Sequence, residues 1–290
     1  MTADAALTGV STVGAVAAGA SLILAPHVTG VLAAAGMLSA DGRCKTLDAA
    51  ADGYVRTEAV WALPLWSAEP PLAAAPAATT AAAAAAVRSA PAMLLSSAVN
   101  QDGRSSSLTA PNGPSQQEVL AAAARGAFPA LQRPPDRLEM HGTGTALGDP
   151  IEFGAAVAVH SASDSGGSAG PPLTLGAIKS SFGHSEAAAG AWGLLHAAAQ
   201  LQRRGGGQLP HLRSLNPFVA QVLDRGRRAG GGGGGGGGEG GLAAAAARQD
   251  RSAASGEGAD GAEQGPSLTV CGVSSFAFQA WTKHVCPHFD

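Results

Sequence analysis

Hydrophobic and polar residues are arranged unevenly along the chain, and the first ordered pattern lies near the N-terminus. The short apolar run Ser21–Leu24 ends at Pro26, which is typical of a buried strand. The residues from Val28 to Gly36 then predict a helix that is closed by its final glycine. Asp41-Gly42 and Asp52-Gly53 indicate turns. This segment therefore predicts one strand and one helix, followed by loops.

The central part of the chain, from about residue 91 to 225, alternates between strand-like and helix-like patterns. Short apolar runs that predict strands occupy Leu138–Met140 and Leu173–Ile178. A helix is predicted over Ser115–Ala124, with Ser115 as its cap and Glu118 completing a capping box. A second helix is predicted to begin at Asp149, its N-cap, which Pro150 follows. A third is predicted over Ser185–Gln200. This alternation predicts an α/β layered fold.

Two low-complexity stretches interrupt these patterns. Residues 67–90 are rich in Ala, Pro and Thr and predict a surface insertion, since they offer few large side chains to a core. Residues of about 226–265 include nine consecutive glycines and predict a flexible loop. Leu268–Val270 and Gly272-Val273 predict a return to strand structure. The expected organisation is therefore three blocks, 1–66, 67–90 and 91–290.

Composition and charge narrow the function classes. The 290 residues carry a net charge of −3, and only 13% are charged, which argues against nucleic-acid binding. The three cysteines Cys44, Cys271 and Cys286 form neither a disulfide framework nor a zinc spacing, so we expect a reducing compartment. We expect the cytoplasm, with a plastid as the alternative compartment. No charged side chain lies between Asp4 and Asp41, but Pro26 interrupts this stretch and favours a buried strand and helix over a membrane span.

The first candidate chemical motif spans residues 139–152. His141 directly follows a predicted strand and precedes a loop of glycines and threonines, including Thr143 and Thr145. Such a loop lets the backbone approach a ligand closely, and its hydroxyls can bind a polar ligand chain. The spacing matches no phosphate-binding loop. A capped turn beside a hydrogen-bonded histidine remains the alternative interpretation.

The second candidate motif spans residues 177–190 and contains Lys179, His184 and Glu186. We expect a helix N-terminus to favour the neutral form of the imidazole. A neutral imidazole can donate a hydrogen bond to a developing oxyanion, with Lys179 and Glu186 orienting or tuning the ring. The alternative is a surface Lys/Glu pair beside a helix-capping Ser185.

The third motif spans residues 272–285, where Phe276 and Phe278 point to the same side of an extended segment. Simple core packing is the favoured interpretation of these residues. The eight histidines are scattered along the sequence, and we expect no metal site.

Several long motifs resemble those of one enzyme family and occur in that family's order. They are AGMLSADGRCKTLDAAADGYVR, SSAVNQDGRSSSLTAPNGPSQQ, HGTGTALGDPIE and IKSSFGHSEAAAG, with SLNPF and GVSSFAF extending the match toward the C-terminus. The chain thus resembles β-ketoacyl synthases, above all the ketosynthase domains of type I polyketide synthases. The resemblance covers roughly residues 18–66, 92–225 and 268–285.

This resemblance implies a partial thiolase-like αβαβα layered fold: the C-terminal half from 91 onward, plus the end of the N-terminal half in 1–66. In the family, a cysteine takes an acyl chain as a thioester, and two histidines promote decarboxylation of a malonyl-type extender. The substrates are carried on the phosphopantetheine of an acyl carrier protein, and no other cofactor is implied.

By motif, His141 and His184 resemble the two histidines, and Lys179 resembles the supporting lysine. Thr143 and Thr145 resemble phosphopantetheine contacts, and Phe278 the gating phenylalanine whose backbone amide helps form the oxyanion hole. The implied partners are acyl carrier protein and a second copy or the remainder of a larger synthase, without nucleic acid or membrane.

Departures from the family pattern affect the expected activity. The family's nucleophile lies in a DTACSS-type motif upstream of the segment that begins near Gly19, and the sequence contains no such motif. Cys44 matches a non-nucleophilic family position. The family's lysine-serine-asparagine is here Lys179-Ser180-Ser181, its GFGGTN loop is replaced at 277–282, and its RGEG is replaced at 56–59. We therefore expect that this chain alone does not condense acyl groups. The alternatives are a non-catalytic carrier-binding or dimerisation module, or one part of a split or truncated synthase.

Overall fold

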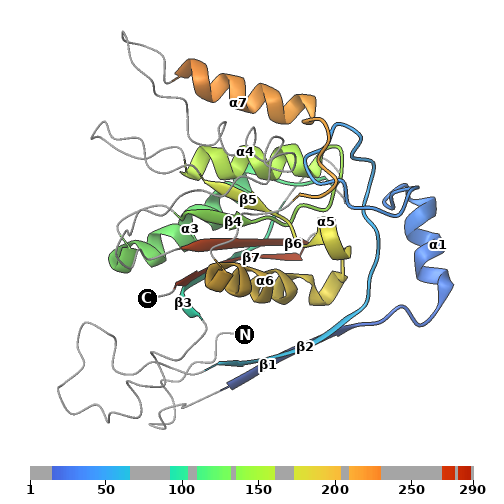
Figure 1. The fold of residues 1–290 in the computed structure, drawn as a ribbon, viewed down its shortest axis with the longest axis horizontal. Coiled ribbons are helices and arrows are strands. Elements are labelled where there is room, and N and C mark those ends of the chain that lie inside the picture. Colours follow the sequence, from blue (N-terminus) through green and yellow to red (C-terminus); the bar gives the residue numbers. More distant parts are fainter. Residues whose placement is uncertain are drawn as a thin grey trace.

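The computed structural model describes residues 15–65, 92–103, 110–131, 135–160, 173–203, 209–229, 270–277 and 280–288. The predicted insertion at 67–90, nearly all of the glycine-rich stretch and Phe278 lie outside these residues. Within them, the mixture of strands and helices confirms the predicted α/β class (Figure 1).

A five-stranded mixed sheet forms the centre of the molecule. Its order is β3 (Met93–Asn100), β7 (Ala280–His288), β6 (Cys271–Ala277), β4 (Arg137–Glu139) and β5 (Thr174–Gly176). The strands β4, β5 and β6 run parallel, whereas β7 is antiparallel to both of its neighbours. The C-terminal ends of β4 and β5 lead into the two histidine motifs. Because the two strands are parallel, they end at the same edge of the sheet, and the two motifs therefore begin at that edge.

Helices cover both faces of this sheet. The helices α3 (Gly113–Leu131) and α4 (Gly148–His160) pack side by side on one face, and α7 (Pro217–Ala229) packs outside α4. The helix α6 (Ala189–Arg203) covers the opposite face, preceded by the short α5 (Lys179–Phe182) and the 3₁₀ turn η2 (Glu186–Ala188). Figure 1 shows α4 and α6 on opposite sides of the strands.

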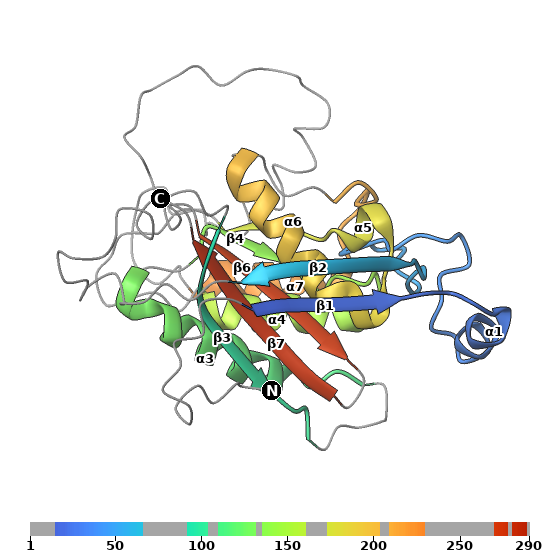
Figure 2. The same ribbon diagram turned by 90° about the horizontal axis from the view of Figure 1, so that it is seen from below.

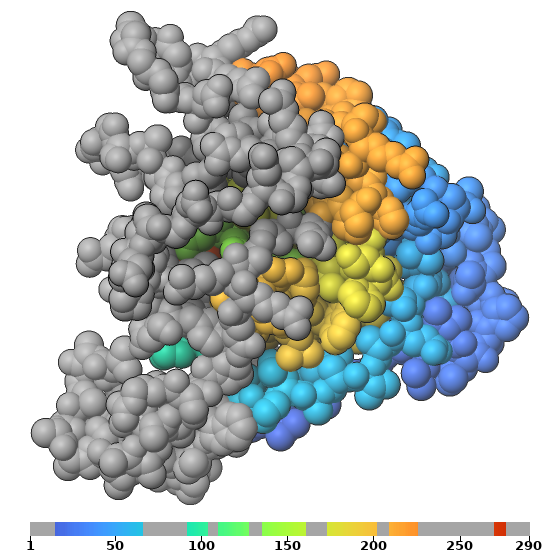
Figure 3. Space-filling view, viewed as in Figure 1, coloured from blue at the N-terminus to red at the C-terminus, as the bar shows by residue number. Residues whose placement is uncertain are grey.

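A second sheet layer lies beyond α6. The strands β1 (Ala15–Ser21) and β2 (Ala59–Leu65) form an antiparallel ribbon, and α6 lies between this ribbon and the central sheet (Figures 1 and 2). The layers thus alternate α, β, α, β. The helix α1 (Pro26–Ala34) has no buried residue and lies at the outer edge of the described surface (Figure 3).

The main core lies between the central sheet and the helices α4 and α7. It contains large side chains from several elements, among them Leu47, Leu138, Met140, Phe153 and Val219. A smaller cluster, with Leu201 and Val273, lies between α6 and β6. Leu47 comes from the N-terminal block, so this block contributes to the same core as the rest of the chain.

The predicted element boundaries need several corrections. Ser21–Leu24 is not a buried strand: β1 ends at Ser21, and Leu22 and Leu24 beyond it are 51% and 85% exposed. The strand predicted over 173–178 is only Thr174–Gly176, and residues 226–229 of the predicted loop belong to α7. The predicted helix over 185–200 is divided into η2 and α6.

Two predicted helix caps were wrong. Helix α3 begins at Gly113, and its cap is Asn112 instead of the predicted Ser115. The Oδ1 atom of Asn112 accepts a hydrogen bond from the backbone N–H of Ser115, which lies inside the helix. In α4, Asp149 is already helical, and the Oγ1 atom of Thr145 accepts the N–H of Gly148. In both cases a side chain slightly upstream satisfies the first free N–H groups of the helix. Asp149 is thereby left to bind other parts of the chain.

No described helix is both long and apolar enough to span a bilayer. In the described residues, no group of three or more His, Cys, Asp or Glu side chains is arranged to hold a metal ion.

Candidate active site

A cavity of about 800 Å³ opens beside the two histidine motifs. Its size lies within the range of small-molecule sites. Four of the six predicted site residues line it, namely His141, Thr143, Thr145 and His184. Lys179 is not among the lining residues and is only 2% exposed. Phe278, the sixth, lies outside the described residues, whereas the preceding Phe276 lines the cavity.

His141 stands two residues past the end of β4, and the buried side chain of Glu152 holds its backbone. Oε1 of Glu152 accepts the N–H of His141 at 2.7 Å, and Oε2 accepts the N–H of Gly142 at 2.9 Å. The Nδ1 atom of His141 accepts a hydrogen bond from the backbone N–H of Phe276, at 3.2 Å. Since Nδ1 is an acceptor, the proton of the neutral ring lies on Nε2.

His184 lies between α5 and η2, and its ring has the same arrangement. The backbone N–H of Glu186 donates to Nδ1 of His184 at 3.2 Å, so this proton also lies on Nε2. The two imidazoles meet edge to face, with ring centroids 5.3 Å apart and planes at 88°. The cavity therefore holds two neighbouring N–H donors, an arrangement that can bind one oxygen and stabilise negative charge on it.

The surroundings keep both imidazoles neutral. Burial, with the positive charge of Lys179, lowers the pKa of His184 from 6.5 to about 3. Burial, Lys179 and the other histidine lower the pKa of His141 well below 6.5. For His184 the neutral form was predicted from a helix dipole, whereas the causes for both rings here are burial and Lys179.

Buried acidic residues surround Lys179 from several elements. Burial lowers the pKa of Lys179, while the carboxylates of Glu139 and Glu152 oppose this shift. Asp149 is 1% exposed and accepts the N–H groups of Leu47 and Gly144, yet burial raises its pKa to about 6. Lys179 thus acts on the histidines through its charge from behind the cavity wall.

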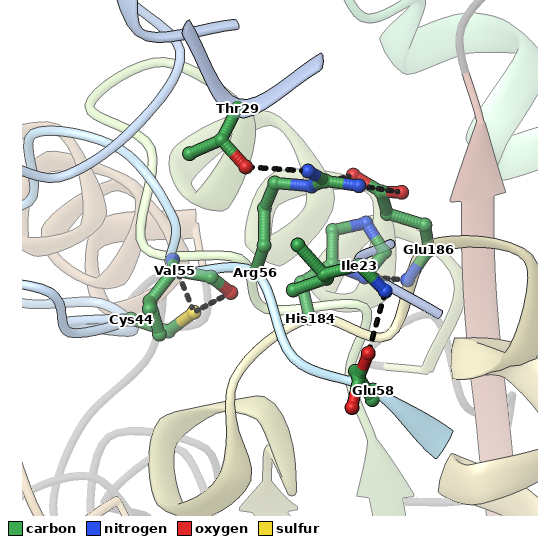
Figure 4. A network of polar contacts seen from close by, with 8 residues as sticks. All are labelled: Ile23, Thr29, Cys44, Val55, Arg56, Glu58, His184 and Glu186. Atoms are coloured by element: carbon green, nitrogen blue, oxygen red, sulfur yellow. Dashed lines mark hydrogen bonds and ion pairs between the residues drawn. The ribbon is translucent and has the colours of Figure 1, made fainter. Parts of the chain in front are cut away.

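Neither of the two cysteines whose side chains are described lines the cavity. Cys44 is 1% exposed, and its Sγ interacts with the backbone N–H and C=O of Val55, as Figure 4 shows. Burial raises the pKa of Cys44 to about 11, so this thiol stays protonated at neutral pH. Sγ of Cys271 donates to the carbonyl of Gly272 within β6. A thiol in such a setting is a poor nucleophile.

Sequence reasoning missed several residues that hold this site. Glu152 lies in the second turn of α4, where it accepts two N–H groups of the histidine loop, and its place in the motif alone does not reveal this role. Phe276 was interpreted as core packing, but its ring lies 5.6 Å from that of His141. Tyr54, whose ring lies 5.1 Å from that of His184, carried no sequence signal, because its partner is 130 residues away.

The depressed pKa of His184 gives a prediction about pH. We expect the Cε1–H signal of His184 in a nuclear magnetic resonance titration to stay constant between pH 5 and 8, because the folded ring titrates only near pH 3. The unfolded chain would bind a proton on this ring from pH 6.5 downward. The stability contribution of His184 is therefore full above pH 6.5 and is lost as the pH falls toward 3. A titration midpoint near 6.5 in the folded protein would contradict this.

Comparison with known proteins places these observations in a family context. The family described as β-ketoacyl synthase, N-terminal domain, matches residues 6–69, and the family described as β-ketoacyl synthase, C-terminal domain, matches residues 91–213. A phenolphthiocerol/phthiocerol polyketide synthase of Mycobacterium tuberculosis is 39% identical over 208 residues. The erythronolide synthase EryA2 of Saccharopolyspora erythraea is 41% identical over 186 residues. These alignments cover 71% and 63% of the chain but only 12% and 5% of the two relatives.

Solved structures agree with this result. The oxazolomycin ketosynthase domain OzmH KS7 of Streptomyces albus superposes with a TM-score of 0.69 at 25% identity, over 96% of this chain and 42% of that one. The ketosynthase from module 6 of the bacillaene synthase of Bacillus subtilis gives a TM-score of 0.68 with the same identity and coverage. The chain thus has the expected thiolase-like layered fold and spans less than half the length of these ketosynthases.

Proposed function

Since the chain belongs to the β-ketoacyl synthase family, we propose that its cavity binds a malonyl-type thioester and decarboxylates it. The substrate would be carried on the phosphopantetheine arm of an acyl carrier protein. The observation that carries this proposal is that the two neighbouring histidines have the same protonation and the same tautomer. Both Nδ1 atoms accept a backbone N–H, so both rings offer an Nε2–H at one cavity.

The chemistry follows from these two donors. The thioester carbonyl oxygen accepts the two Nε2–H groups, and the bond between the α-carbon and the carboxylate breaks. Carbon dioxide leaves, and the electron pair of that bond forms an enolate whose oxygen the histidines stabilise. Without an acyl thioester to attack, the α-carbon takes a proton from water, and a malonyl thioester becomes an acetyl thioester. Neutral imidazoles fit this role because each ring accepts a backbone N–H at Nδ1 and still carries the Nε2–H that donates to the oxygen.

The remaining predicted residues take supporting roles in this proposal. Thr143 and Thr145 line the cavity and would contact the phosphopantetheine arm. The Oγ1 atom of Thr145 accepts the N–H of Gly148, so its own hydroxyl proton would be the donor to a ligand. Lys179 would keep the histidines neutral through its charge. The role proposed for Phe278 concerns a residue outside the described part of the chain.

Condensation with an acyl group needs a thiolate in addition, and the setting of the described cysteines does not favour one. Cys44 is buried with a pKa of about 11, and neither Cys44 nor Cys271 lines the cavity. We therefore infer that the nucleophile for condensation is neither Cys44 nor Cys271 and comes from another part of the chain or from another chain. The same observation favours a second candidate role, in which the chain binds the carrier protein without completing condensation. Assembly with a second copy or with the rest of a larger synthase is part of this proposal, since the polyketide synthase relatives are much longer than this chain.

The function is tested with purified protein and malonyl-loaded acyl carrier protein, with and without an added acyl thioester. We expect mass spectrometry of the carrier to show loss of carbon dioxide and formation of the acetyl form, above the rate without protein. We expect no β-ketoacyl product in either case. A β-ketoacyl product would contradict the inference about the nucleophile, and a carrier that stays malonylated would contradict the proposed decarboxylation.

A further inference from the structure

The segment that follows Gly53 holds the backbone of His184 from the side. The N–H of His184 donates to the carbonyl of Val55 at 2.7 Å, and the carbonyl of His184 accepts the N–H of Thr57 at 3.0 Å. These two bonds form a parallel bridge between Arg56 and His184. The two bonds fix the position of the His184 backbone, but they do not determine which ring nitrogen carries the proton.

The proton position depends on Glu186, whose backbone is unusual. Glu186 has φ +45°, and it is one of only two described non-glycine residues with positive φ, the other being Leu47. In this conformation the residue donates its N–H to Nδ1 of His184. A residue with a side chain avoids the left-handed region and persists there only when its surroundings hold it. A restraint on Glu186 is therefore required.

The side chain of Glu186 is held by Arg56 in a two-pronged ion pair. Nε of Arg56 donates to Oε1 at 2.8 Å, and a second guanidinium nitrogen donates to Oε2 at 3.1 Å. The third nitrogen donates to Oγ1 of Thr29 in α1 at 2.6 Å. Figure 4 shows the guanidinium lying between the threonine and the carboxylate, above the imidazole. The Arg56 side chain is 7% exposed and that of Glu186 is 32% exposed, and the two parallel bonds fix the geometry of the pair.

From this chain of contacts we propose that Arg56 and Glu186 are positioning residues for His184. Their ion pair anchors Glu186 in place, which keeps the Glu186 N–H on Nδ1 and thereby keeps the proton on Nε2. The inference rests on the proposed function in one respect, since Nε2–H is the donor that the decarboxylation uses. Neither residue needs to contact substrate for this role.

The test measures the hydrogen bond and the tautomer directly, without turnover. The full-length protein, labelled with ¹⁵N, is compared with Arg56→Met and Glu186→Ala, and the His184 signals are assigned with His184→Ala. In the unaltered protein we expect a scalar coupling between the Glu186 amide nitrogen and Nδ1, and ring shifts of a pure Nε2–H form. In both variants we expect the coupling to be lost and the ring shifts to move toward a mixture of tautomers.

Two further variants separate the backbone effect from a general loss of structure. Glu186→Gly removes the carboxylate but accepts positive φ without strain, so it should keep more of the coupling than Glu186→Ala. As a control, Asp41→Asn removes the charge of one of the two carboxylates that pair with Lys45, and it should leave the His184 signals unchanged. If Arg56→Met does not fold, Arg56→Lys takes its place, and a weakened coupling is expected because lysine cannot bind two oxygens in this geometry.

The outcomes are distinguishable from a failure of the proposed function. A folded Arg56 variant that keeps the coupling and the pure Nε2–H shifts would overturn the proposal. So would equal signals in Glu186→Ala and the unaltered chain. Because neither measurement requires decarboxylation, the positioning role can stand even where the carrier protein stays malonylated.

Discussion

Replacing His184 with alanine is expected to lower the rate of malonyl-thioester decarboxylation about a hundredfold or more. The substitution removes one of the two imidazole N–H donors proposed to bind the enolate oxygen, and loss of one oxyanion donor typically costs this much in rate. The remaining donor of His141 would hold the enolate oxygen alone. The measurement is the rate at which the malonyl carrier becomes the acetyl carrier, followed by mass spectrometry at saturating carrier.

Two matched variants test whether this effect comes from the donor. His184→Gln keeps an N–H group at the end of its side chain and should recover part of the lost rate. His27→Ala removes an exposed histidine of α1 that does not line the cavity, and it should leave the rate unchanged. Wild-type activity in His184→Ala would show that decarboxylation takes place without this ring.

The largest loss of stability is expected from Gly144→Ala. Gly144 has φ +78°, and a Cβ atom there would meet the backbone nitrogen of Lys45 and, at 2.9 Å, the carbonyl carbon of Cys44. Backbone atoms cannot move aside as a flexible side chain can. Left-handed strain and overpacking together should cost roughly 3 to 5 kcal/mol of unfolding free energy. The measurement is the midpoint of urea unfolding, followed by circular dichroism.

Gly42→Ala is the matched control for this substitution. Gly42 has nearly the same backbone angle, φ +67°, but a Cβ there would have no atom within 4 Å. Only the strain of the left-handed conformation remains, about 1 to 2 kcal/mol. Equal shifts of the unfolding midpoint in the two variants would mean that the close approach of Gly144 to the Cys44–Lys45 backbone does not exist in solution.

The sequence predicts those elements best that carry local signals. Helices α1, α3, α4 and α6 were all predicted as helices, although the caps predicted for α3 and α4 and the start predicted for α6 were wrong. Strands β2 and β3 were missed, since β2 is apolar along its whole length and β3 does not alternate regularly between polar and apolar residues. The exposed setting of Leu22 and Leu24 was also unpredictable, because burial depends on what packs against a segment, and no local pattern records this.

The candidate site shows the same division. His141, His184, Thr143 and Thr145 stand in dense local motifs, and they were predicted to share one site, as they do at the cavity. The roles assigned to them stay predictions. Arg56 was noted only within a departure from the family motif, because its partner Glu186 lies 130 residues later in the sequence. The left-handed conformation of Glu186 is equally invisible in the sequence, as it depends on that distant partner.

These long separations have a consequence for the order of folding. Thr46 bonds to Gly142 across 96 residues, Leu47 to Asp149 across 102, and Phe276 to His141 across 135. Contacts so far apart close large loops, which slows folding, although further lengthening of such a loop adds little to its entropic cost. The alanine- and glycine-rich tracts between these partners therefore add less to the entropic cost of folding than their length suggests. On the ribosome, the proton position of His141 can be set only after residue 276 has emerged, so the chemistry of this cavity is among the last properties the growing chain acquires.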